Sequence, residues 1–262
     1  MTQTFFDALA HPTLSGGWQG RDLDASFAAL NAELEQGGFA GACAIGLDGV
    51  EGYSHEAFAA ACRAHPKLVP IAGFNPLSDP GRLRTLRDLG FVGIKIHPRF
   101  SGLTQRLGLL GPWLREAGEA GLVVFLCTYC HGPIGQMPAG DPYLDVLVSL
   151  QQAPATRVVL VHGGDVQLLR YAELVRFNAN LLLDLSLTLM KYPGSSIDAD
   201  LRFLFQHFDR RICVGSDWPE YRLAAVQQRF ERFAEGLSTD KRANIAFRNL
   251  NHFLGLEHRL DH

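Results

Sequence analysis

The sequence predicts an α/β protein, a single (β/α)8 barrel with an extra helix at its C-terminal end. Eight short apolar runs alternate with amphipathic helical segments, and the length of 262 residues is close to the roughly 250 that are typical of this fold. The alternative is a doubly wound open sheet. No Gly-x-Gly-x-x-Gly and no P-loop sequence follows a strand, so neither nucleotide fingerprint supports that alternative. No linker or low-complexity segment divides the chain, and we expect one domain, residues 1–262.

The predicted elements follow one another in a regular order. Strands are expected at residues 4–10, 41–45, 68–74, 93–97, 122–127, 157–162, 181–184 and 212–215. Helices are expected at residues 24–36, 54–64, 79–89, 111–120, 143–152, 165–178, 198–207, 221–235 and 239–254. Ser54 is the expected N-cap of its helix, and Asp79 with Pro80 opens the next one. The longest irregular stretches, 98–108 and 128–142, both follow strands, where the loops of a barrel build active sites.

Composition narrows the function classes. A net charge of −3 and a pI near 6.4 give no basic surplus, so no nucleic-acid partner is expected. No apolar run reaches the roughly 18 residues of a membrane span, and the first residues lack the pattern of an export signal. We therefore expect a cytoplasmic protein without a membrane partner that acts on a small molecule, whether as a monomer or as a homo-oligomer. Five cysteines in such a chain indicate reduced thiols.

Polar or sulfur-bearing side chains end five of the predicted strands. They are His11, Lys95 with His97, Cys127, His162 and Asp217. A barrel gathers the carboxyl ends of all its strands at one rim, so these side chains are expected to meet there. Taken singly, each of these residues could also have a purely structural role. Asp217, for example, could merely form a turn before the helix that follows Pro219.

The sequence resembles the amidohydrolase superfamily, and within it the amidohydrolase-2 group, over essentially its whole length. The residues that carry the resemblance are Asp7 to Pro12, the Gly-Ile-Lys-Ile-His-Pro of 93–98, the Val-His-Gly-Gly of 161–164, the Gly-Ser-Asp-Trp-Pro of 215–219 and the closing segment 249–256. The group contains metal-dependent hydrolases, lactonases and decarboxylases with a TIM-barrel fold. The resemblance therefore implies an enzyme of one of these kinds.

The resemblance implies a metal site that this chain only partly preserves. The family's first-strand histidine pair is here Leu9 and His11, and the histidine that ends the fifth strand is here Cys127. Asp217 matches the aspartate that binds the metal and takes the proton of the attacking water, and His162 matches an acid/base histidine. A zinc ion needs three protein ligands and a water, and His11, Cys127 and Asp217 could supply them. Binding of one divalent metal, zinc first among the candidates, and binding of none both stay open.

We predict a hydrolase that acts on an amide or lactone bond of a small, carboxylated molecule. Asp217 and His162 are the expected catalytic residues, and Lys95, His97 and Arg99 are expected to bind the substrate. One alternative is a non-oxidative decarboxylase of an unsaturated or aromatic acid. The other is a non-catalytic barrel that serves as a binding partner, for which Leu9 and Cys127 are the best argument.

A competing motif lies at residues 127–131, where Cys-Thr-Tyr-Cys-His matches the attachment signature of a c-type haem. Covalent haem attachment requires an accessible loop, whereas Cys127 is expected at the end of an apolar strand. We therefore expect Cys127 in the barrel and not in a haem site.

Overall fold

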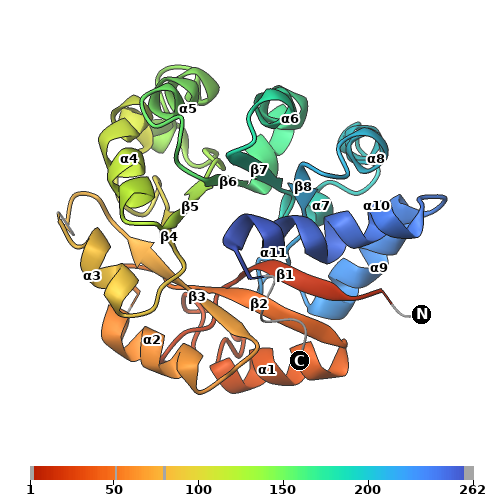
Figure 1. The fold of residues 1–262 in the computed structure, drawn as a ribbon, viewed down its shortest axis with the longest axis horizontal. Helices are drawn as coiled ribbons and strands as arrows, with labels where there is room; N and C mark the ends of the chain where they lie inside the picture. The colour runs from red at the N-terminus through yellow and green to blue at the C-terminus, as the bar shows by residue number, and fades with distance from the viewer. Residues whose placement is uncertain (1–2, 51, 79–80, 257–262) are drawn as a thin grey trace.

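The computed structural model describes residues 3–50, 52–78 and 81–256, and within them a single parallel sheet of eight strands runs in the order β1 to β8 (Figure 1). The strands are β1 (Phe5–Ala10), β2 (Phe39–Ile45), β3 (Leu68–Phe74), β4 (Gly93–Ile96), β5 (Val123–Cys127), β6 (Val158–Val161), β7 (Leu181–Asp184) and β8 (Ile212–Cys213). The last strand returns to the first: the Ala8 amide donates to the Val214 carbonyl over 3.1 Å, and Ala10 pairs with Trp218 in a parallel bridge. The predicted barrel fold is confirmed.

Helices surround the strands, as the view along the barrel shows (Figure 1). The larger ones are α1 (Phe27–Gln36), α2 (His55–Arg63), α3 (Leu83–Asp88), α4 (Gly111–Glu119), α5 (Pro142–Gln151), α6 (Leu168–Phe177), α8 (Ile197–His207) and α9 (Leu223–Ala234). Ser54 caps α2 as predicted, since its side chain accepts from the Ala57 amide. The predicted opening of α3 at residues 79–80 lies outside the described residues. No helix in the described ranges is both long and apolar enough to cross a membrane.

Several short elements differ from the sequence prediction. The helix expected at 165–178 is divided into a 3-10 turn, η3 (His162–Gln167), and α6. The helix expected at 239–254 consists of α10 (Thr239–Ala243), a π-helical turn η4 (Asn244–Arg248) and α11 (Asn249–Leu254). The remaining short helices, which were not predicted, are η1 (Thr104–Leu109), η2 (Ile134–Gln136) and α7 (Thr188–Lys191). Apart from α10, η4 and α11, these turns follow strands, so they shape the loops at the rim.

Two apolar clusters hold the barrel together. One fills the layer between the strands and the surrounding helices. The other fills the barrel interior and joins inward-facing strand residues such as Phe125 and Val159 to Leu250, Phe253 and Leu254 of α11. Helix α11 thus covers the amino ends of the strands, and it crosses the centre of the view in Figure 1. This arrangement leaves the carboxyl ends of the strands for the functional site.

A buried carboxylate joins the first strand to the last. Asp7 is 2% exposed and accepts hydrogen bonds from the Leu9 amide over 3.2 Å and from the amide and hydroxyl of Ser216. Burial raises the pKa of Asp7 to about 7, because desolvation outweighs these hydrogen bonds. The folded protein therefore retains a proton here that an unfolded aspartate loses near pH 4.

Asp7 is expected to make the protein less stable as the pH rises. The pKa of Asp7 is raised in the folded state. Its contribution to stability is therefore fully present below the pKa of an unfolded aspartate, and it decreases as the pH rises from there to about 7. Relative to wild type, the Asp7→Asn variant should gain on the order of 1 kcal/mol of unfolding free energy for each pH unit between pH 5 and pH 7. Urea unfolding of both proteins at several pH values measures this difference. A difference that does not change with pH would contradict the assignment.

Candidate active site

A cavity of about 310 Å³ opens at the carboxyl ends of the strands. Six of the seven side chains predicted for the site line it: His11, Lys95, His97, Arg99, His162 and Asp217. The seventh, Cys127, is buried behind them, where its sulfur lies 3.9 Å from Nε2 of His97. The structure thus brings the strand-end residues together at one rim, as the alternation of strand side chains suggests.

Asp217 is held in place by its neighbours on both sides. Its backbone has a φ of 56°, and its amide donates to the Leu9 carbonyl over 2.9 Å. Ser216, just before it, is bound to Asp7, and Trp218, just after it, is fully buried and donates from Nε1 to Glu33 over 2.7 Å. These contacts leave the carboxylate of Asp217 free to face the cavity.

His11 contacts a carbonyl on one side and two charged groups on the other. Nδ1 lies 3.2 Å from the carbonyl oxygen of Ile45, which can only accept, so Nδ1 must carry the hydrogen. Nε2 lies 3.3 Å from the Lys95 ammonium and 3.4 Å from Oδ1 of Asp217. Burial and the charge of Lys95 lower the pKa of His11, so the ring is neutral at pH 7 and Nε2 accepts from Lys95.

The Asp217 carboxylate is ionised. Burial raises the pKa of Asp217, but the positive charge of Lys95 lowers it, and the lowering prevails. An ionised carboxylate beside a lysine and inside a cavity is able to accept a proton from a water molecule.

His162 presents one fixed ring nitrogen to the cavity. Its Nδ1 lies 3.1 Å from the carbonyl oxygen of Ser186, and its backbone amide donates to Asp184 over 3.3 Å. Burial lowers the pKa of His162 to about 3, although the charge of Asp217 opposes this shift. The ring is therefore neutral, with the hydrogen on Nδ1 and a lone pair on Nε2. Asp184, at the end of β7, positions His162 through this hydrogen bond.

The turn that carries His162 requires glycine. Gly163 and Gly164 both have positive φ, and a Cβ on Gly164 would lie 2.0 Å from the ring of Tyr171. The Gly164 amide also donates to the Thr128 hydroxyl over 2.8 Å. This local constraint delays the start of the predicted helix to Leu168 and turns His162 toward the rim.

Gly164→Ala is expected to destabilise the protein by about 3 kcal/mol, because left-handed strain and a clash with a buried ring add together. The matched control is Gly132→Ala, where φ is not positive and no atom lies within 4 Å of the added Cβ. Chemical denaturation of both variants measures the effect, and equal stabilities would contradict the steric argument.

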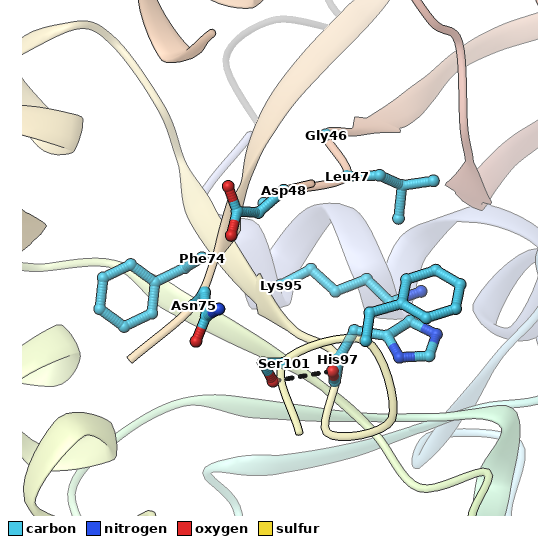
Figure 2. A pocket seen from close by; sticks show the side chains of 10 residues that line it. Gly46, Leu47, Asp48, Phe74, Asn75, Lys95, His97 and Ser101 are labelled. Carbon is cyan, nitrogen blue, oxygen red and sulfur yellow. Dashed lines mark hydrogen bonds between the residues drawn. The ribbon is translucent and has the colours of Figure 1, made fainter. Parts of the chain in front are cut away.

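His97 lies between the main cavity and a smaller one that has room for about one water molecule. Figure 2 shows this small cavity, with Asp48 and Asn75 on one side and the imidazole of His97 on the other. The His97 ring stacks on Phe100 at a centroid distance of 4.0 Å. Its Nδ1 is buried and has no hydrogen-bond partner among the described residues, which leaves an atom that a ligand can satisfy.

Arg99 and Lys191 both contact Tyr129 in the outer part of the cavity. Of these residues, the sequence predicted only Arg99. The Arg99 guanidinium lies 4.7 Å from the ring centroid of Tyr129, and the Lys191 ammonium lies 4.1 Å from the same centroid. Lys191 also donates to the Tyr129 hydroxyl over 2.8 Å. Tyr129 and Lys191 were missed because they lie in connections where the sequence predicted no helix or strand, although both connections follow strands and so belong to the predicted rim. Arg106 is exposed and does not line the cavity.

The side chains at the predicted metal position do not fit a divalent ion. His11 and Asp217 meet there, but Cys127 contacts His97 and Leu9 offers only hydrocarbon. Within residues 3–50, 52–78 and 81–256, no group of three or more His, Cys, Asp and Glu side chains lies close enough to hold a metal. The Lys95 ammonium stands beside the two remaining donors and would repel a second cation. We therefore assign no reaction step to a metal.

Comparison with solved structures supports the fold. An uncharacterized TIM-barrel protein from Bordetella bronchiseptica superimposes with a TM-score of 0.78 at 17% identity and covers 97% of this chain and 99% of its own. A probable 2-pyrone-4,6-dicarboxylic acid hydrolase from Acinetobacter baumannii gives a TM-score of 0.70 at 18% identity, with 96% and 99% covered. The 2,6-dihydroxybenzoate decarboxylase from Rhizobium gives 0.68 at 16% identity, with 98% and 100% covered. At these identities the likeness establishes the fold alone.

Sequence comparison establishes the family. A search of curated proteins finds no match. The family model described as Amidohydrolase matches residues 5–249, which include all the strand-end residues of the cavity. The amidohydrolase-2 resemblance in the sequence is therefore confirmed, and the chain belongs to the amidohydrolase family.

Proposed function

We propose that this protein is a hydrolase that opens an amide or lactone bond in a small, carboxylated molecule. The observation that carries the proposal is the placement of the Asp217 carboxylate 3.4 Å from Nε2 of His11, which also contacts Lys95, in a cavity at the carboxyl ends of the strands. Hydrolysis of such a bond needs a group that takes a proton from water and a group that stabilises the negative charge on the carbonyl oxygen.

The side chains of the cavity suit these two tasks. Asp217 takes the proton of the attacking water, since it is an ionised carboxylate that lines the cavity. The Lys95 ammonium contacts His11 at the same part of the cavity, and it can donate to the carbonyl oxygen as negative charge develops there. His162, with a free lone pair on Nε2, is able to orient the water or to take a proton and return it to the leaving group.

The outer cavity suits a carboxylate on the substrate. Arg99 and Lys191 present two positive charges around Tyr129, and Lys191 also pairs with the buried Asp165 over 3.5 Å. Arg99 can bind a carboxylate with two parallel hydrogen bonds, while Lys191 acts as a point charge. We infer that the carboxylate lies at this end and the reacting bond lies near Asp217.

Lys191→Met is expected to raise the KM for a carboxylated substrate about tenfold and to change kcat little, since it removes one charge-assisted contact that is made equally in the ground and transition states. Arg106→Met removes an exposed charge in η1, outside the cavity, and serves as the control. Steady-state kinetics of the two variants provide the measurement, and equal KM values would contradict the proposed carboxylate position.

A substrate screen tests the proposed function. Lactones and amides with and without a carboxylate are offered to the purified protein, and ring opening, amine release and carbon dioxide release are recorded separately. Hydrolysis of carboxylated compounds supports the proposal. Release of carbon dioxide from unsaturated or aromatic acids would replace it with a decarboxylase, as named among the structural neighbours. Ligand binding without turnover would identify a binding protein.

A further inference from the structure

A buried lysine lies beside the two atoms that would hold a metal. Lys95 is 2% exposed, and its Nζ lies 3.3 Å from Nε2 of His11. His11 donates from Nδ1 to Ile45, so the atom that it offers to Lys95 is a lone pair. The ammonium group therefore has a ready acceptor inside the barrel, although burial of an unpaired lysine charge is costly.

His11 and Asp217 have the spacing of two ligands of one metal ion, which is one edge of its coordination tetrahedron. Zinc binds nitrogen and oxygen at about 2.1 Å, so two ligand atoms at tetrahedral angles lie about 3.4 Å apart. Nε2 of His11 and Oδ1 of Asp217 are 3.4 Å apart. The Lys95 ammonium can only donate, so the Nε2 atom that faces it carries a lone pair, as does Oδ1 of Asp217, and two facing lone pairs require a positive charge nearby. Lys95 supplies that charge.

We propose that Lys95 is the built-in cation of this site, taking the place of a divalent metal and keeping one from binding. Its ammonium contacts the substrate oxygen on which negative charge develops. That part rests on the proposed hydrolytic function, whereas exclusion of a metal does not depend on it. The residues at the other two expected ligand positions agree, because Leu9 is hydrocarbon within the barrel core and Cys127 is turned to His97.

Charge explains why the lysine and a metal exclude each other. An ion bound between His11 and Asp217 would lie within a few ångströms of the Lys95 ammonium, and like charges at that distance repel strongly even at the effective dielectric of a protein. Among the residues that the structure describes, His11 and Asp217 are the donors that remain there, and a catalytic zinc normally has three. Removal of the lysine charge should therefore allow the remaining pair to bind zinc more tightly.

Titration with zinc chloride, followed by calorimetry, tests the proposal without any substrate. Lys95→Met, which keeps the length of the side chain and removes the charge, should bind zinc at least tenfold more tightly than wild type. Lys95→Arg, which keeps the charge, should bind it no more tightly than wild type. Wild type purified without chelator should contain far less than one equivalent of zinc, manganese or iron by elemental analysis.

Two further variants locate the effect. Lys191→Met removes a charge from the outer cavity and should give a smaller gain than Lys95→Met. Lys95→Met combined with Asp217→Asn should lose the gain, which places the zinc at the His11–Asp217 edge. A full metal equivalent in purified wild type, or equal zinc affinity in wild type and Lys95→Met, would overturn the proposal. Circular dichroism of each variant confirms that folded proteins are compared.

The result is separable from the proposed function. If no lactone or amide is hydrolysed but Lys95→Met gains zinc affinity, the lysine excludes metal and the reaction assignment is wrong. If hydrolysis is found and is abolished by a chelator, the reaction assignment stands and the role of Lys95 is wrong. Hydrolysis that is unchanged by chelator and lost in Lys95→Met supports both.

Discussion

Asp217→Asn is expected to lower turnover about a thousandfold, because a general base contributes roughly 10²–10⁴ to the rate of proton transfer. The amide cannot accept the proton of a water molecule at neutral pH, yet it has the shape of the carboxylate. The backbone at Asp217 has a φ of 56°, a conformation that asparagine adopts readily, so the fold should not change. Substrate affinity should stay within a fewfold of wild type, since the carboxylate-binding cations are untouched.

The measurement is steady-state kinetics on the substrate found by the screen, together with calorimetric binding of the same substrate to the variant. Asp88→Asn is the matched control, because Asp88 is an exposed carboxylate on α3 outside the cavity. Unchanged turnover in Asp217→Asn would return Asp217 to the role of a turn-forming residue. A loss of binding that equals the loss of turnover would instead indicate that Asp217 contacts the substrate directly.

The fold was predictable because buried parallel strands have a simple sequence signature. Strands β3 and β7 have the predicted bounds, 68–74 and 181–184, since each is an apolar run between polar segments, which in β7 ends with Asp184. The first residue of a helix was harder to predict where either of two neighbouring residues can be its N-cap. Helix α1 was expected from Asp24, but Ser26 is the residue whose side chain accepts from the Ala29 amide. Sequence alone does not decide between two such neighbours.

The deep part of the site was predictable for the same reason as the strands. Strand alternation and the common rim of a barrel dictate which side chains meet, so the sequence pattern alone places His11, Lys95 and Asp217 together. The outer part was not predictable, because Tyr129 and Lys191 lie in connections whose paths depend on distant contacts. The position of Cys127 behind His97 depends on side-chain packing, which strand periodicity does not specify.

His162→Asn is expected to lower turnover by about a hundredfold while leaving stability nearly unchanged, because it removes only the nitrogen that faces the cavity. The asparagine amide can replace the Nδ1–H of His162 in its hydrogen bond to the Ser186 carbonyl. His162 has a φ of 67°, and asparagine is among the residues that tolerate this conformation. The loop that Asp184 and Ser186 support should therefore persist.

His162→Gln makes the opposite change, since its amide reaches the position of Nε2 but not that of Nδ1. If His162 acts through Nε2, turnover falls in both variants because neither amide accepts a proton, and only His162→Gln loses thermal stability. Retained turnover in His162→Asn would show that His162 serves only to hold the loop. Because the pKa of His162 is about 3, the residue is neutral throughout pH 5–8, and the pH profile of kcat/KM should show no ionisation of this histidine in that range.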